Sequence, residues 1–118
     1  MVLLYKETKY LKLQLELAEE ISGTTATLQC ITEKDGTETA TALSSTYDLA
    51  DDTFVTLGIK VSGKDRTSAK VEFYVDRTKV ATHTTNIPDD ENLALGAMEL
   101  SGDATGTKTA TIDYIFAC

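Results

Sequence analysis

The chain of 118 residues has no tryptophan, one proline, one histidine and two cysteines. So few sulfur and imidazole groups argue against a structural zinc site, which needs four ligands. Cys30 lies in a segment of alternating apolar and polar residues, and Cys118 is the last residue. The sequence is compatible with a disulfide between them and with two separate thiols. No sequence rule supports the disulfide. The reducing compartment expected below favours a buried thiol at Cys30 and a free one at Cys118.

Long apolar runs and an excess of basic residues are lacking as well. No segment approaches the roughly 20 apolar residues of a membrane span, and the start, MVLLYKETKYL, has no signal-peptide pattern. We therefore expect no membrane partner, and synthesis and folding in the cytoplasm. The net charge is −8, and residues 1–59 carry four basic against ten acidic side chains. Because such a surface repels phosphate backbones, we expect no nucleic-acid partner.

Threonine, by contrast, is abundant: it occupies twenty positions in a chain that is 42% hydrophobic. Its branched Cβ is costly in helices and suits the pleated surface of a sheet. The hydrophobic content is sufficient for a core, and the length suits one domain spanning residues 1–118. The composition therefore predicts a single all-β domain.

The strongest strand pattern lies near the N-terminus, where four leucines alternate with Lys12, Gln14 and Glu16. Helix propensity is also high in this stretch, but a helix would scatter the leucines around its circumference, whereas a strand aligns them. We therefore predict a strand whose apolar face lies against something apolar. These leucines are candidate protein-contact residues: Leu11, Leu13, Leu15 and Leu17.

Alternation and turn signals divide the rest of the chain into short segments. Further strands are expected at residues 25–32, 38–43, 54–61, 71–75, 80–84 and 110–116. Residues 93–100 suit a helix by propensity and a strand by context. Turns or loops are expected at residues 34–36, 44–52, 62–68, 86–92 and 101–107, the first on its Asp-Gly signal. About eight short strands predict an antiparallel β-sandwich, of jelly-roll type.

The stretch VEFYVDRTKVATHTTNI predicts a β-hairpin with its turn at Asp76-Arg77-Thr78. Val71, Phe73 and Val75 share one face and are predicted core residues. After the turn, Val80, Thr82 and Thr84 are expected on one face, with His83 on the other. No Ser or Cys nucleophile motif accompanies this histidine, so we expect a structural or surface role for it.

Several of these segments resemble a known family. TLGIKVSG, KVEFYVDRTKVATHTTNIP, TKTATIDYIFA and LQCITEKDGTETATALSSTYDLADDTFV resemble concanavalin A-like lectin/glucanase domains, in the versions found in bacteriophage virion proteins. The resemblance covers residues 25–118 and implies a compact concanavalin A-like jelly roll. It identifies a fold family better than a function.

Two departures from the family carry expectations of their own. Arg77 replaces the family's turn glycine, so we expect a turn other than the primed type. The family also has further strands ahead of the matched region, where this chain offers only residues 1–24. We expect residues 1–24 to form an arm or edge strand, and the chain to be a homo-oligomer or to become ordered on assembly.

The candidate chemistry is sparse. Glucanases of this fold need paired carboxylates in an E-x-D-x-x-E pattern, which does not occur here. The acidic loops around residues 48–52 and 89–92 do not resemble calcium loops, so we expect no metal, cofactor or catalytic residue. Tyr74, facing outward beside Glu72 and Asp76, is the best candidate in the chain for an aromatic platform that binds sugar. A protein contact is the favoured interpretation of this residue, because tyrosine is enriched at interfaces.

Together these features predict a non-enzymatic structural protein of a phage virion, assembled in the host cytoplasm. The preferred interpretation is a capsid decoration or cement protein that contacts the major capsid protein or other virion proteins. The alternative is a carbohydrate-binding module on a tail fibre or other host-facing appendage.

Overall fold

The computed structural model is all-β, with eight strands in the part of the chain that it describes. The described residues are 2–6, 9–20, 23–47, 53–64, 67–88 and 94–97, with side chains over 28–47, 53–64 and 67–88. The strands are β1 (Val2–Lys6), β2 (Lys9–Glu20), β3 (Gly23–Lys34), β4 (Thr37–Ala42), β5 (Leu57–Ser62), β6 (Lys70–Val75), β7 (Thr78–His83) and β8 (Ala94–Ala97). One turn of 3-10 helix, η1, spans Ser45–Tyr47.

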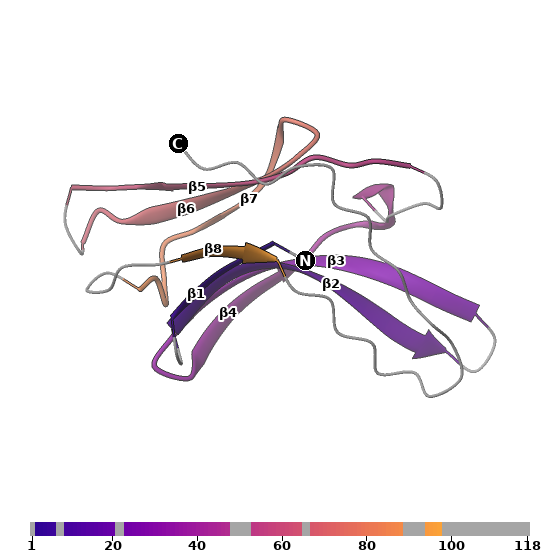
Figure 1. Ribbon diagram of the computed structural model, residues 1–118, viewed down its shortest axis with the longest axis horizontal. Helices are drawn as coiled ribbons and strands as arrows, with labels where there is room; N and C mark the ends of the chain where they lie inside the picture. Colours follow the sequence, from indigo (N-terminus) through magenta and orange to yellow (C-terminus); the bar gives the residue numbers. More distant parts are fainter. Residues whose placement is uncertain are drawn as a thin grey trace.

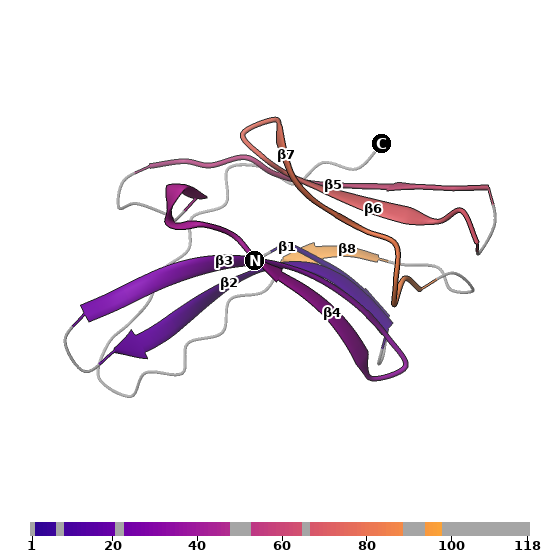
Figure 2. The ribbon, with the colours of Figure 1, turned by 180° about the vertical axis from the view of Figure 1, so that it is seen from behind.

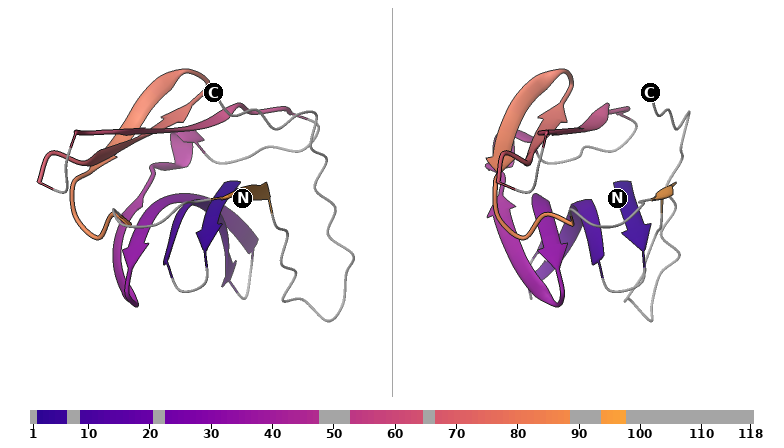
Figure 3. Two further views of the ribbon diagram at one scale, coloured as in Figure 1. Left: turned by 60° about the vertical axis from the view of Figure 1, so that its left-hand side comes forward. Right: turned by 90° about the vertical axis from the view of Figure 1, so that its left-hand side faces the viewer.

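These strands form two antiparallel sheets. One has five strands in the order β4-β3-β2-β1-β8, and the other has three in the order β5-β6-β7. Figure 1 shows the three-stranded sheet as the upper layer and the five-stranded sheet as the lower one, and Figures 2 and 3 show the same two layers from behind and from the side. The predicted all-β class is confirmed at this level.

The core lies between the two layers. Its fully buried members come from both sheets: Leu28 and Cys30 on β3, Val71 and Phe73 on β6. Leu43, Val75 and Ile87 complete it. The prediction that Val71, Phe73 and Val75 are core residues is confirmed, since their exposed fractions are 0%, 0% and 4%. The buried thiol predicted at Cys30 is also confirmed, whereas Cys118 lies outside the described residues.

The leucine-rich segment forms strand β2, as predicted, and not the competing helix. Its register pairs Leu13 with Cys30 and Leu15 with Leu28. Directly paired residues share a face, so the leucine positions lie on the face of the sheet that carries the core. The ambiguous segment 93–100 contains strand β8, which pairs with β1. The strand predicted at residues 110–116 lies outside the described residues.

One predicted loop and the start of one predicted strand are corrected. The segment beginning at Asn86 was expected to be a surface loop, yet Ile87 is 7% exposed and Pro88 is buried. Ile87 is apolar and packs with Leu43 and Phe73, so burying it outweighs the polar bias of its neighbours. The strand predicted from residue 54 begins only at Leu57, and Phe54 before it is 72% exposed.

The β6–β7 turn also differs from the expectation. Asp76 and Arg77 have φ values of 47° and 67°, the signs required at both central positions of a type I′ turn, so the prediction of a non-primed turn is wrong. The backbone N–H of Thr56 donates to Asp76 Oδ1 at 2.9 Å, and Asp76 N–H donates to the Thr56 carbonyl at 2.8 Å. These two bonds hold the turn in the left-handed region without a glycine.

A β-bulge overturns the predicted shared face of Val80 and Thr82 on β7, whereas His83 lies opposite Thr82 as predicted. Phe73 pairs with Ala81 and Tyr74 with Lys79, so Val80 is an extra residue on β7. An extra residue reverses the alternation beyond it. His83 therefore faces the interior and is 4% exposed, whereas Thr82 is exposed. The predicted shared face of Val80 and Thr82 does not form.

Candidate functional site

The outer face of the three-stranded sheet carries the candidate site. Because Val71, Phe73 and Val75 face the core, alternation puts Lys70, Glu72 and Tyr74 of β6 on the opposite side. Strand pairing then sets Lys60 of β5 opposite Glu72, and Lys79 of β7 opposite Tyr74. Three consecutive strands thus bring their polar residues to one surface.

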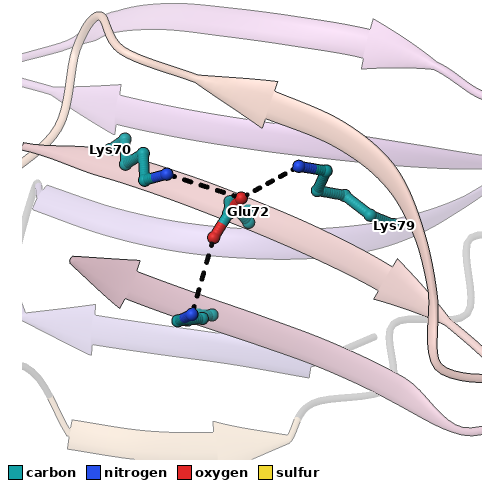
Figure 4. A network of polar contacts seen from close by, with 4 residues as sticks. Lys70, Glu72 and Lys79 are labelled. Carbon is teal, nitrogen blue, oxygen red and sulfur yellow. Dashed lines mark hydrogen bonds and ion pairs between the residues drawn. The ribbon is translucent and has the colours of Figure 1, made fainter.

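Figure 4 shows the Glu72 carboxylate at the centre of this surface with lysine ammonium groups around it. Lys79 Nζ donates a hydrogen bond to Oε1 at 3.1 Å, Lys70 Nζ lies 3.6 Å from the same oxygen, and Lys60 Nζ lies 3.9 Å from Oε2. The Glu72 side chain is only 7% exposed, whereas those of the lysines are 47–65% exposed. We call this surface the lysine face: Lys60, Lys70 and Lys79 around Glu72.

The charges in the lysine face act on one another. The hydrogen bond from Lys79, followed by the charges of Lys70, Lys79 and Lys60, lowers the pKa of Glu72 below 4.5 against the opposing effect of its burial. The same bond and the Glu72 charge raise the pKa of Lys79 above 10.5. At neutral pH Glu72 and Lys79 are therefore ionised. Three lysines around one glutamate give a formal net charge of +2.

This arrangement suits contact better than proton transfer. A glycosidase acid needs a carboxyl group with a raised pKa that faces a second carboxylate. Glu72 has a lowered pKa and lysine neighbours instead. A group of three exposed lysines on the outer face of a sheet offers instead a surface for a negatively charged partner.

Tyr74 lies on the same outer face, half-buried and opposite Gly58 of β5. A Cβ added at Gly58 would lie 3.4 Å from Tyr74 Cβ, so the glycine leaves room at this point of the sheet. The predicted outward facing of Tyr74 is confirmed by its place in β6. The role of Tyr74 in a protein contact stays a prediction. The same holds for the four leucines of β2, whose positions lie on the core-carrying face of their sheet.

His83 belongs to a second polar group, between the sheets. Its Nδ1 lies 3.1 Å from Thr32 Oγ1 on β3, and its Nε2 lies 2.8 Å from Thr41 Oγ1 on β4. The ring meets Phe73 edge-on, with centroids 5.1 Å apart. Next to it, Thr39 Oγ1 contacts Thr85 Oγ1 at 2.8 Å. We call this the hydroxyl cluster: His83, Thr32, Thr39, Thr41 and Thr85.

Its hydrogen bonds fix the protonation of the histidine. The Thr32 hydroxyl donates to the Thr85 carbonyl at 3.0 Å, so its oxygen must accept from Nδ1–H of His83. The Nε2 atom then accepts from the Thr41 hydroxyl. Burial lowers the pKa of His83 below 6.5, which favours this neutral form. The ring joins both sheets and has both nitrogens occupied, which is a structural role.

The sequence predicted the outward position of Tyr74 but neither polar group. A signal for the lysine face was present, because lysine occupies the outward position in LGIKV, KVEFY and TKV. Recognising it required the register between three strands. The hydroxyl cluster depended in addition on the unsignalled bulge at Val80.

Comparison of the chain with protein-family models, with curated proteins and with solved structures found no match. Over the residues with described structure, no three His, Cys, Asp or Glu side chains gather in a way that could hold a metal ion. No helix in the same ranges is long and apolar enough to cross a membrane.

Proposed function

We propose that this chain is a non-enzymatic structural protein of a bacteriophage virion, and that it acts as a capsid decoration or cement protein. Its partners in this role are the major capsid protein or other virion proteins. The proposal joins two supports: the resemblance of residues 25–118 to virion proteins, and the lysine face as a prepared contact surface. The lysine face is the observation that carries it.

The proposed architecture is a concanavalin A-like jelly-roll sandwich. Its support is the pair of antiparallel sheets with a shared core, and the β5-β6-β7 meander formed by the stretch that carries the strongest resemblance. In such a fold the outer face of a sheet is the natural contact surface, because the inner face is needed for the core.

The mechanism is surface burial at many equivalent positions. Each apolar Å² removed from water contributes about 25 cal/mol, and a modest interface repeated over a shell adds considerable stability. The lysines contribute a different effect, since complementary charge speeds encounter and fixes the orientation of the partner. Glu72 holds the three lysine heads near one point, which reduces the freedom lost on binding.

Imaging the particle of origin tests the proposal. We expect density for this chain on the capsid lattice, and stable rebinding of the purified chain to particles stripped of it. Density at a tail tip, with binding to host glycans that is lost in Tyr74→Ala, would favour the carbohydrate-binding alternative. Hydrolysis of β-glucan that disappears on Glu72→Gln would contradict a non-enzymatic role.

A further inference from the structure

The lysine face differs in charge from the rest of the molecule. The chain as a whole carries −8, whereas the lysine face carries +2 from three lysines and one glutamate. A cationic surface on an acidic protein is complementary to other copies of the same protein. The question is which part of a second copy it would meet.

The β3–β4 hairpin offers the matching charge. Residues 33–38, EKDGTE, hold three acidic side chains and one lysine, a net charge of −2. Glu33 pairs directly with Glu38 across the hairpin, and two like charges in that relation repel each other. Burial is the main cause that raises the pKa of Glu33 above 4.5, and the Glu38 charge adds to it. We call residues 33–38 the acidic hairpin.

The acidic hairpin and the lysine face lie on opposite sides of the molecule. Thr32 is fully buried toward the core, so alternation puts the neighbouring Glu33 and its partner Glu38 on the outer face of the five-stranded sheet. In Figure 1 the β3–β4 turn lies at the lower left, whereas the three-stranded sheet forms the upper layer. One chain therefore cannot bring the two surfaces together by itself.

We propose that the lysine face of one copy binds the acidic hairpin of the next, so that copies associate head-to-tail through matched charges of +2 and −2. This inference rests on the proposed function and names a partner for its contact surface: a second copy of the chain. Tyr74 adds a half-buried aromatic side chain beside the lysines, a residue type enriched at interfaces. A contact between two different surfaces is heterologous, so it extends into a row or closes into a ring.

A charge-swap experiment tests the pairing. The first variant combines Lys60→Glu with Lys70→Glu, and the second combines Glu33→Lys with Glu38→Lys. In the first variant both surfaces carry −2, and in the second both carry +2. We expect each variant alone to sediment as a monomer, and an equimolar mixture to associate, because the mixture restores opposite charge at every contact.

Wild-type protein supplies the reference. We expect its sedimentation coefficient to rise with concentration at about 0.02 M salt, where the Debye length is roughly 20 Å, and to stay at the monomer value at about 0.5 M, where it is roughly 4 Å. Lys64→Glu makes the charge change of one of these substitutions in the loop after β5, and should leave association unchanged. Lys60→Gln with Lys70→Gln removes charge without adding repulsion, and should weaken association by roughly fivefold or more.

Three outcomes would overturn the inference: a wild-type monomer at low salt, a mixture that stays monomeric, or a Lys64→Glu variant that also fails to associate. Binding to stripped particles separates this failure from that of the proposed function. A chain that binds particles but does not self-associate overturns only the head-to-tail contact. A chain that self-associates but does not bind particles overturns only the decoration role. Association of the wild type with acidic polysaccharide but not with itself would also overturn the second copy as the partner.

Discussion

On its inner face, strand β6 packs Phe73 against the edge of the His83 ring; on its outer face, it carries Glu72 beneath three lysines. Both polar groups are nearly covered, with His83 4% and Glu72 6% exposed. Their partners differ. His83 is neutral and hydrogen-bonded to threonine hydroxyls of the other sheet, whereas Glu72 is charged and paired with lysines whose side chains are 47–65% exposed.

The two kinds of partner imply different costs when one of them is removed. Removing a hydroxyl partner of His83 leaves a buried atom unsatisfied, at a cost comparable to a large part of the stability of a small domain. Removing one lysine leaves Glu72 with two others, at a surface where ion pairs contribute little. The inner face is therefore constrained by the fold, while the proposed contact surface on the outer face is not.

The largest effect is expected from the inner aromatic residue. Phe73→Ala should lower the free energy of unfolding by about 3–5 kcal/mol, because a fully buried ring leaves a cavity between the sheets. Tyr74→Ala, one residue along on the outer face, is the matched control and should cost about 1 kcal/mol. Urea denaturation of both variants measures the difference. Equal losses would contradict the assignment of the two faces.

Removal of one hydroxyl group from the hydroxyl cluster should have the next largest effect on the free energy of unfolding. Thr32→Val keeps the shape but takes the hydrogen-bond partner from His83 Nδ1 and from the Thr85 carbonyl, and should cost about 1–3 kcal/mol. Thr82→Val on the exposed side of β7 is the control and should change stability by less than about 0.5 kcal/mol. If both variants unfold at the same urea concentration, the hydroxyl cluster does not stabilise the fold.

The contributions of His83 and Glu72 to the free energy of unfolding should be lost in separate pH ranges. Because burial lowers the pKa of His83, the unfolded chain binds a proton below about pH 6.5 before the folded protein does. The stability from neutral His83 is complete above that pH and is lost as pH falls toward the lowered pKa. The pKa of Glu72 is lowered from 4.5, chiefly by the hydrogen bond from Lys79, so its contribution is present above 4.5 and is lost only as pH falls below that value.

Urea unfolding at about pH 7.5 and about pH 5.5 measures the first of these ranges. His83 is the only histidine in the chain, so His83→Gln should remove most of the stability change between the two pH values. Glu72→Gln should leave that change as it is in the wild type. A pH dependence that survives in His83→Gln would contradict the burial of a neutral ring.

The smallest effect is expected at the turn that joins β6 and β7. Arg77 adopts a positive φ that glycine accepts freely, so Arg77→Gly should stabilise the protein by about 0.5–1 kcal/mol. Gly36 holds the corresponding position in the β3–β4 turn, with open space where a Cβ would lie, so Gly36→Arg should cost a similar amount. Thermal unfolding of the two variants should shift in opposite directions. A lower melting temperature for Arg77→Gly would show that the arginine side chain stabilises the turn.

The sequence predicted those elements of the fold that follow from local pattern. Alternation in VEFYV was sufficient to place Phe73 in the core, and the Asp-Gly pair marked the β3–β4 turn. The prediction that Val80 shares a face with Thr82 was wrong because no glycine in the sequence marks the one-residue bulge at Val80. The primed turn at Arg77 was missed because Thr56, twenty residues from Asp76, supplies the bonds that hold it.

The candidate site was harder to predict than the fold, since it is a property of three strands together. Taken singly in the sequence, each lysine is interpreted as an ordinary solvated side chain. Only the register of the three strands shows that the lysines surround Glu72. The hydroxyl partners of His83 come from the other sheet, 51 and 42 residues away in sequence. Local spacing carries no information on contacts of that separation.

The central claim is that the outer face of β5-β6-β7 binds a partner without being needed for the fold. The most direct test measures two quantities on one variant, Lys60→Gln with Lys79→Gln: the free energy of unfolding, and the amount of chain that cosediments with particles stripped of it. We predict that the urea midpoint of unfolding stays close to that of the wild type, because ion pairs of exposed lysines contribute little to stability, while cosedimentation is largely lost. Undiminished cosedimentation, or loss of the folded state, would contradict the claim.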